Sequence, residues 1–231
     1  MSLFTPAELS CPHCSQAFTF ELCASVNADR RPDLRQAILD ESFQQATCPH
    51  CQGRFRMEPQ LNYLDVGRGQ WLAAFPRQRV DDWHTLEADA MAGFNRAYGT
   101  GASRAERELG DALKTRVVFS WDALREKLLA FDAGLDDVAL EELKLLLMRD
   151  MQEPPLPVGA ELRLTGVSAD GGELTITVLD REGQPLEGLD VPRDLLDEIT
   201  ADPEAWAELG ASLGAGAFVD VQRLSRGQQA S

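Results

Sequence analysis

Two identical tetrapeptides constrain this chain more than any other feature of its sequence. Both read Cys-Pro-His-Cys, and they occupy residues 11–14 and 48–51, with 33 residues between them. A Cys-x-x-Cys turn points both of its sulfurs toward one place, so two such turns brought together form a tetrahedral thiolate cage. The sequence therefore predicts one structural Zn²⁺ held by Cys11, Cys14, Cys48 and Cys51.

The free energies favour a metal as the organiser of this region. Closing a loop of this length costs about 3 kcal/mol of chain entropy, whereas a structural zinc contributes on the order of 10–16 kcal/mol. Four cysteines already fill a tetrahedral site, so His13 and His50 are expected to lie on the turns without binding the metal. Such a closed site is typical of structural zinc, because a catalytic zinc keeps one position open for water.

Cys-Pro-His-Cys is also a dithiol of thioredoxin-like oxidoreductases, which gives a competing interpretation. In those enzymes the motif begins a helix, whose dipole lowers the pKa of the thiol. Here each copy is followed by alternating apolar and polar residues, which is typical of a strand. Thiol redox chemistry is therefore the less favoured reading.

The N-terminal part is predicted to be a zinc ribbon with an added β-hairpin, over residues 1–80. Phe18 and Phe55 occupy the same place relative to their cysteine pairs, which indicates a weak internal duplication. A hairpin turn is expected at Gly67-Arg68-Gly69, between two apolar runs. The expected strands are 18–26, 54–58, 61–66 and 70–75, with a short helix that opens at Pro32.

The rest of the chain is predicted to be helical and then mixed. Residues 81–151 show helical spacing of apolar side chains, with a capping-box signature at Ser103 and a short apolar run at 117–119. A proline-rich connector over 152–157 marks a boundary. Beyond it we expect a small acidic α+β module over 158–224, with two strands around a turn at 170–172, two helices and a last strand at 218–224. A disordered polar tail is expected at 225–231, and the overall class is α+β.

Charge and hydropathy limit the partners. The net charge is −16, and it is spread unevenly: residues 1–80 are neutral, 81–153 carry −7 and 154–231 carry −9. An acidic protein repels phosphate backbones, which disfavours nucleic-acid binding. The start of the chain lacks a secretory signal and no apolar run is long enough to span a bilayer. We therefore expect a cytoplasmic protein with no membrane partner, where cysteines stay reduced.

Several other residues have side chains that could react or bind an ion, and for these the bland interpretation is a structural or solvent-exposed role. Cys23 is expected to be a small buried filler rather than a reactive thiol. Arg54 and Arg56 could offset the negative charge of a zinc tetrathiolate or lie on a solvated strand face. An acidic patch comprises Asp136, Asp137, Glu141 and Glu142. It could hold a cation, but the favoured interpretation is that these carboxylates lie at the start of a helix and on its solvated face.

The paired Cys-Pro-x-Cys motifs, each followed by a strand pattern, resemble the bacterial CpXC family. The resemblance extends to Arg116–Trp121 and to Gly134–Asp137, and it covers about residues 8–150. It implies a cytoplasmic bacterial zinc protein of a largely uncharacterised family, in which Cys11, Cys14, Cys48 and Cys51 fall on the family's namesake positions. The family supplies no reaction.

Three classes of function remain open at this stage. The leading one is a non-enzymatic zinc protein whose surfaces bind an unknown protein partner or a second copy of the chain. The alternative is a nucleic-acid-binding or transcription-associated zinc ribbon, which would use the arginines of its neutral first part: Arg30, Arg31, Arg35, Arg54, Arg56, Arg68, Arg77 and Arg79. An enzyme, most simply a thiol redox protein, is the least favoured.

Overall fold

The computed structural model describes residues 2–151 and 156–226 and divides the chain into two compact units, 1–121 and 122–231. We call these the first and the second unit. Both combine strands with helices, so the α+β class expected from the sequence is confirmed. None of the described helices is long and apolar enough to cross a membrane.

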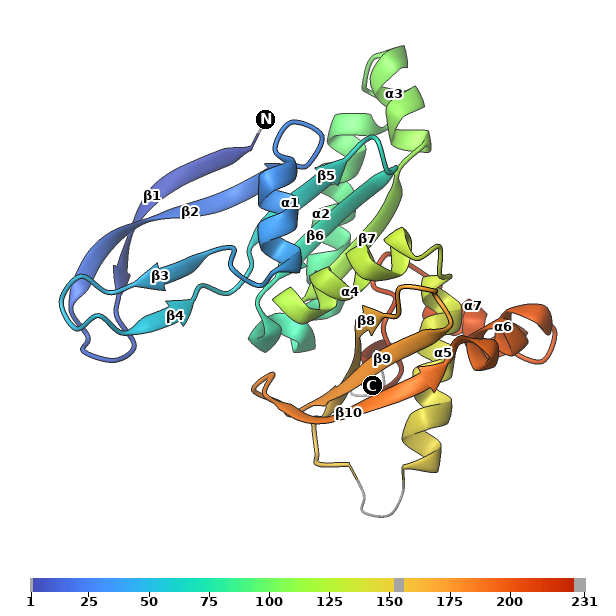
Figure 1. Cartoon of the computed structure of the whole chain (residues 1–231). Helices are drawn as coiled ribbons and strands as arrows, with labels where there is room; N and C mark the ends of the chain where they lie inside the picture. The colour runs from blue at the N-terminus through green and yellow to red at the C-terminus, as the bar shows by residue number, and fades with distance from the viewer. Residues whose placement is uncertain (1, 152–155, 227–231) are drawn as a thin grey trace. The chain divides into compact units, whose positions relative to one another are not determined.

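A five-stranded sheet forms the centre of the first unit (Figure 1). Its strand order is β1-β2-β5-β6-β7, and the neighbours are alternately antiparallel and parallel. The expected hairpin is present, because β5 and β6 pair antiparallel around the turn that contains Gly69. The strands are β1 (Leu3–Ser10), β2 (Ala17–Asn27), β5 (Leu61–Asp65), β6 (Gln70–Phe75) and β7 (Lys114–Phe119).

Two helices cover opposite faces of this sheet. Helix α1 (Pro32–Leu39) has proline in its first turn, as the sequence predicts, and buries Ile38. Helix α2 (Trp83–Tyr98) packs on the other face, where Phe94 lies 5.2 Å from the ring of Trp71. A 3₁₀ helix, Arg77–Asp82, precedes α2, and α3 (Arg104–Asp111) follows it. The capping box at Ser103 is complete, with both of its hydrogen bonds formed.

The two cysteine motifs occupy the tips of two β-hairpins. The first motif lies in the turn between β1 and β2, and the second lies in the turn between β3 (Gln45–Thr47) and β4 (Arg54–Arg56). The β3-β4 ribbon forms a separate two-stranded sheet. Figure 1 shows the tips of the two hairpins side by side at one end of the first unit. Short isolated ribbons are only marginally stable, so a link between the tips matters for the fold.

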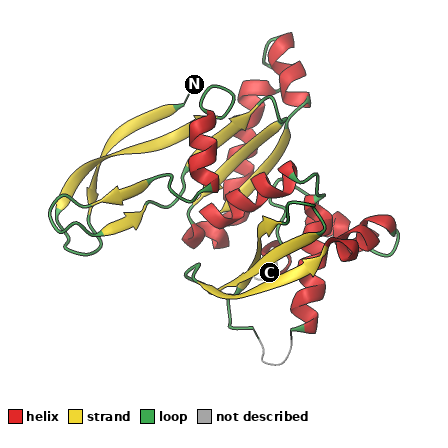
Figure 2. Ribbon diagram, in the orientation of Figure 1, coloured by secondary structure: helices red, strands yellow, loops and turns green. Residues whose placement is uncertain are grey.

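The second unit is a three-stranded antiparallel sheet packed with helices (Figure 2). Its strand order is β10-β9-β8, and its core includes Leu140, Leu164 and Ile176. The strands are β8 (Glu161–Val167), β9 (Glu173–Leu179) and β10 (Pro185–Pro192). The helices are α4 (Trp121–Asp132), which begins at the boundary between the units, α5 (Asp137–Asp150), α6 (Arg193–Ala201), α7 (Ala207–Leu213) and α8 (Gln222–Arg226).

The structure departs from the sequence-based expectations at several points. The boundary expected between residues 80 and 81 differs from the observed one, which lies between 121 and 122. Because β7 pairs in parallel with β6, residues 81–121 belong to the first unit. The remaining residues of the expected helical segment, 122–151, belong to the second. The expected strand at 218–224 is wrong, because these residues form a bend, a turn and the start of α8. Strands β1 and β10 were not expected.

Two expectations fall partly outside the described residues. The proline-rich connector includes residues 152–155, and the expected disordered tail includes 227–231, neither of which the structure describes. At the start of that tail, Ser225 and Arg226 are the last residues of α8.

The core of the second unit yields a first prediction. Leu140 is fully buried in α5, so Leu140→Ala removes buried methyl groups and leaves a cavity. We expect the free energy of unfolding, measured by urea denaturation, to fall by about 2–5 kcal/mol. The matched control is Leu186→Ala on β10, where the side chain is 51% exposed, and it should cost less than about 0.5 kcal/mol. Equal losses in the two variants would contradict the assigned core.

Candidate metal centre

The first cysteine motif is held by a tight backbone turn. The Cys11 N–H donates to the carbonyl of Gln16 at 3.0 Å, and the Ser15 N–H donates to the carbonyl of Cys11 at 2.8 Å. Ser15 adopts a left-handed backbone with φ of 60°. The His13 N–H also points at the Cys11 Sγ, at 3.4 Å. This turn presents two sulfurs and hydrogen-bonds one of them.

The second motif repeats this geometry 37 residues later in the chain. The Cys48 N–H donates to Gly53 O at 2.9 Å, and the Gln52 N–H donates to Cys48 O at 2.9 Å. Gln52 has φ of 59°, as its counterpart Ser15 does. The internal duplication suggested by the sequence is therefore present in the backbone of both turns.

The two histidines link the hairpins to each other reciprocally. His13 Nε2 lies 3.3 Å from the carbonyl of Arg54, which begins β4 after the second motif. His50 Nε2 lies 3.2 Å from the carbonyl of Ala17, which begins β2 after the first motif. A carbonyl oxygen only accepts, so each Nε2 carries the proton and donates it. Each histidine thus joins its own turn to the strand that follows the other turn.

The four sulfurs of Cys11, Cys14, Cys48 and Cys51 gather in one place. All four lie within 4.8 Å of one another. Two cross-motif pairs are closest: the sulfurs of Cys11 and Cys51 are 3.7 Å apart, and those of Cys14 and Cys48 are also 3.7 Å apart. Sulfurs that bind one tetrahedral ion at about 2.3 Å lie about 3.8 Å from each other. The cluster therefore fits a single metal ion, with a small contraction of the wider sulfur pairs.

The thiols alone do not all ionise easily. For Cys14, a backbone hydrogen bond from Gln16 favours the thiolate, but burial and the neighbouring sulfurs together raise the pKa to about 12. For Cys48, burial opposes ionisation, but backbone hydrogen bonds from Cys51 and His50 and the adjacent sulfurs lower the pKa to about 6. A cation in the middle would favour the thiolate at every position. The donor set therefore suits a divalent ion.

An aromatic cluster joins the two motifs through residues on and directly after them. The rings of Phe18 and Phe55, at matching positions after the two motifs, meet edge to face with centroids 6.0 Å apart. His13 contacts Phe55 in the same manner at 6.1 Å. Neither motif begins a helix, since both turns lead into strands. The helix dipole that activates a thioredoxin-like dithiol has no counterpart here.

The other residues singled out near the motifs lie elsewhere. Arg56 does not face the sulfurs: its Nε donates to Phe43 O at 2.9 Å, and its guanidinium lies 4.4 Å from the ring centroid of Trp121. Cys23 is buried on β2, where its Sγ donates to Ser25 O at 3.2 Å. Burial raises the pKa of Cys23, which keeps the thiol protonated and unreactive. Cys23 thus has the filler role expected from the sequence.

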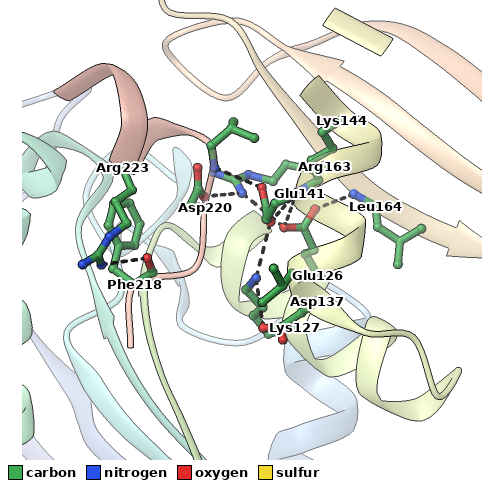
Figure 3. A network of polar contacts seen from close by, with 12 residues as sticks. Glu126, Lys127, Asp137, Glu141, Lys144, Arg163, Leu164, Phe218, Asp220 and Arg223 are labelled. Atoms are coloured by element: carbon green, nitrogen blue, oxygen red, sulfur yellow. Dashed lines mark hydrogen bonds and ion pairs between the residues drawn. The ribbon is translucent and has the colours of Figure 1, made fainter. Parts of the chain in front are cut away.

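The acidic patch is not a solvated face. Asp136 does cap α5, where its Oδ1 accepts from the N–H groups of Val138 and Ala139. However, Asp137, Glu141 and Glu142 are all buried. Asp137 and Glu141 belong to a network of charged side chains inside the second unit, shown in Figure 3.

This network, which we call the buried charge network, is centred on Lys144 and Arg163. The Lys144 Nζ lies 2.7 Å from Glu126 Oε1 and 2.9 Å from Glu141 Oε1. The Arg163 Nη1 lies 2.7 Å from Asp220 Oδ2 and 3.2 Å from Glu126 Oε1 (Figure 3). Its remaining ion pairs join Arg163 to Glu161, and Lys127 to Asp137 and Glu141.

Burial and the neighbouring cations act in opposite directions on the pKa values of the carboxylates in this network. Burial opposes the charge of Glu126, but Lys144 and Arg163 outweigh it and lower the pKa of Glu126. Burial dominates at Glu141 and raises the pKa of that carboxyl. The backbone takes part as well, since Glu141 Oε2 accepts from the Val221 N–H at 3.1 Å. These contacts hold residues 220–221 away from strand geometry, which explains the absence of the expected last strand.

The sequence did contain a signal for the network. Lys144 stands four residues after Leu140 in α5, so it falls on the same buried face as that core residue. A charged residue at a core position of a helix implies a buried partner. Helical spacing alone did not show which partners, because one of the two carboxylates that Lys144 contacts, Glu126, lies 18 residues away on α4.

Comparison with known proteins identifies a family for the chain. A family model described as CpXC protein matches residues 9–144, which is more than half of the chain and includes all four cysteines of the cluster. The chain belongs to the CpXC family. No curated protein and no solved structure matches it.

The turn geometry makes a specific prediction at Gly53. A Cβ on this residue would lie 2.5 Å from His13 Cδ2 and 3.2 Å from Cys51 Sγ. We expect Gly53→Ala to push the His13 ring off its carbonyl partner and to weaken metal retention at least severalfold in a competition titration with a chelator. The control is Gly188→Ala on β10, where a Cβ meets nothing within 4 Å. Unchanged metal retention in Gly53→Ala would contradict the assigned role of His13.

The buried charge network leads to a further prediction. Lys144→Met leaves Glu126 and Glu141 buried without their shared cation, and breaking such a network costs about 3–5 kcal/mol. The control, Arg181→Met, removes a cation of the same unit that is 77% exposed. We expect the control to leave the urea unfolding curve almost unchanged. A loss in Lys144→Met no larger than in the control would show that the network does not stabilise the unit.

Proposed function

We propose that this chain is a non-enzymatic zinc protein. In this proposal one Zn²⁺ is bound by Cys11, Cys14, Cys48 and Cys51, and it holds the two hairpins together so that the folded chain can present a surface to a protein partner. The observation that carries the proposal is the gathering of four sulfurs at nearly tetrahedral spacing. Such a donor set fills every position of a tetrahedral ion, as in structural sites.

Zinc is the ion that these donors favour. Tetrahedral sites of four thiolates select zinc or iron, and soft sulfur ligands disfavour magnesium and calcium. Such thiolates persist where cysteines are kept reduced, which supports a cytoplasmic setting. When bound, the ion supplies cross-linking of the hairpins, while His13 and His50 orient the two turns through their carbonyl bonds.

The nucleic-acid alternative has less support. Of the arginines that might form a basic face on the first unit, Arg35 and Arg68 both pair with Asp65, at 3.7 and 3.2 Å. Arg31 pairs with Asp33, Arg79 pairs with Asp82, and Arg56 stacks on Trp121. Four of the eight arginines therefore have a carboxylate partner, and the remainder of the chain is acidic. A protein partner is therefore the better-supported proposal.

The zinc claim is tested by substitution of one ligand. We expect Cys48→Ser to lose bound zinc and to abolish the cooperative melting of the first unit, since the free energy of metal binding is part of the free energy of folding. The matched control is Cys23→Ser, which changes the one cysteine that lies outside the cluster. It should retain one zinc per chain, as measured by elemental analysis. Full zinc content and an unchanged melt in Cys48→Ser would refute the proposal.

The partner claim needs a separate experiment. The tagged chain is used to capture partners from a bacterial lysate with and without nuclease, and the captured material is analysed by mass spectrometry. The proposal expects a protein that is retained after nuclease treatment and lost with Cys48→Ser. Capture that disappears with nuclease would support the nucleic-acid alternative instead.

A further inference from the structure

A pocket of about 330 Å³ opens on the second unit between helices α5, α6 and α7. Its walls are mainly apolar and include one large aromatic ring, that of Trp206. The apolar lining residues are Val138, Ala139, Ile199, Pro203, Trp206, Ala207 and Ala211. The pocket is separate from both the metal centre and the buried charge network, since none of its lining residues belongs to either.

One carboxylate in this pocket has no counter-ion. Glu142 lines the pocket and is only 5% exposed, yet its carboxylate makes no hydrogen bond or ion pair with any residue in 2–151 or 156–226. Burial, together with the nearby charge of Asp136, raises the pKa of Glu142. The carboxylate oxygens of Glu142 are not among the fully buried polar atoms of the described residues, so a cation that enters the pocket can reach them. A positively charged group is therefore the ligand that this carboxylate favours.

The backbone leaves room for this carboxylate. Gly210 on α7 also lines the pocket, and a Cβ built there would lie 2.8 Å from Glu142 Oε1. The absence of a side chain at this position keeps the carboxyl group at the pocket wall. The pocket therefore combines an apolar lining, an aromatic face and two acidic residues, Asp136 and Glu142.

A second depression continues from the first along the same helices. It measures about 280 Å³, and it shares Ile199 and Trp206 with the pocket that contains Glu142. Its floor is formed by leucines of α5 and α6: Leu143, Leu146, Leu147 and Leu195. Its charged lining is acidic overall, with Asp150, Glu198 and Asp202 against Arg149. We call the two depressions together the α5–α7 groove.

We propose that the α5–α7 groove binds a basic amphipathic helix of a partner protein, with one arginine or lysine side chain inserted against Glu142. This inference rests on the proposed function and specifies the class of partner. The apolar stem of a long basic side chain can pass Trp206 while its charged end pairs with the carboxylate. Apolar side chains of the same helix then cover the leucine floor.

Charge and length favour this occupant. The groove carries five carboxylates and one guanidinium, so a basic segment is attracted to it and an acidic one is repelled. The lining residues on α5 run from Asp136 to Asp150, which spans about 21 Å, or roughly four turns of a bound helix. Amphipathic helices commonly bind such grooves through residues at positions i, i+3 or i+4 and i+7.

The test uses the full chain and two synthetic helical peptides in isothermal titration calorimetry. Both peptides have leucines spaced three and four residues apart, and they differ only at one terminal-turn position, which is arginine in one and its uncharged analogue citrulline in the other. We expect the arginine peptide to bind at least tenfold more tightly. Glu142→Gln should remove this preference by weakening only the arginine peptide, because the pairing of two charges is what distinguishes them.

Two further variants guard against indirect effects. Glu187→Gln removes the same charge from an exposed position on β10 and should leave both affinities unchanged. Gly210→Ala narrows the pocket next to Glu142 and should weaken the arginine peptide. Glu142→Gln is expected to melt at or above the wild-type temperature, since it removes a charge that partial burial and the nearby charge of Asp136 both disfavour.

The results distinguish this inference from the broader proposal that the chain presents a surface to a protein partner. The inference is overturned if neither peptide binds the wild-type chain, or if Glu142→Gln keeps the wild-type preference for arginine. If the lysate experiment captures a protein partner and Glu142→Gln does not affect its binding, the proposal of a partner-binding zinc protein stands. The assignment of the α5–α7 groove as the binding site is then wrong.

Discussion

The first unit depends on the convergence of four sulfurs that come from two hairpin tips. One tip joins the long strands β1 and β2, whereas the other joins the three-residue strands β3 and β4. The shorter ribbon forms only a small sheet of its own, and it is joined to β2 at its base, where Gln44 hydrogen-bonds to Cys23 and Glu21, and also at its tip. The sulfur cluster, the reciprocal histidine bonds and the pair of Phe18 with Phe55 all act at this one place.

The second unit is held together differently. Its apolar core is supplemented by the buried charge network, in which Lys144 and Arg163 each contact more than one carboxylate. Such a network is sensitive to the loss of any one member, because the remaining charges stay buried. The uncompensated Glu142 stands apart from it, in a pocket open to a ligand. Among its described residues the same unit thus contains buried charges that are paired with one another and a carboxylate, that of Glu142, that lines a pocket without a counter-ion.

Local signals in the sequence predicted much of this architecture. The cysteine spacing identified the cluster, Pro32 marked the start of α1, Gly69 marked the β5-β6 turn, and Ser103 marked a capping box. These features depend on residues close together in the chain or on a repeated motif. The same applies to β8 and β9, whose hairpin turn is visible in the sequence.

Features that depend on distant partners were not predictable. Strand β1 contains Pro6 and is largely exposed, so it resembles an irregular segment, although proline is tolerated because β1 is an edge strand. The boundary after residue 121 arises from the parallel pairing of β7 with β6, across an intervening helical stretch. The run at 218–224 looks like a strand, but Asp220 turns inward to Arg163, a partner 57 residues away.

The most direct test of the central claim is X-ray absorption spectroscopy at the zinc edge on the purified full chain. Coordination by the four cysteines predicts a single shell of four sulfur atoms at about 2.3 Å, with no nitrogen or oxygen ligand. A shell that contains histidine nitrogen, or a shell with fewer than four sulfurs, would contradict it, because the carbonyl bonds of His13 and His50 and the closed geometry of the cluster would then be wrong.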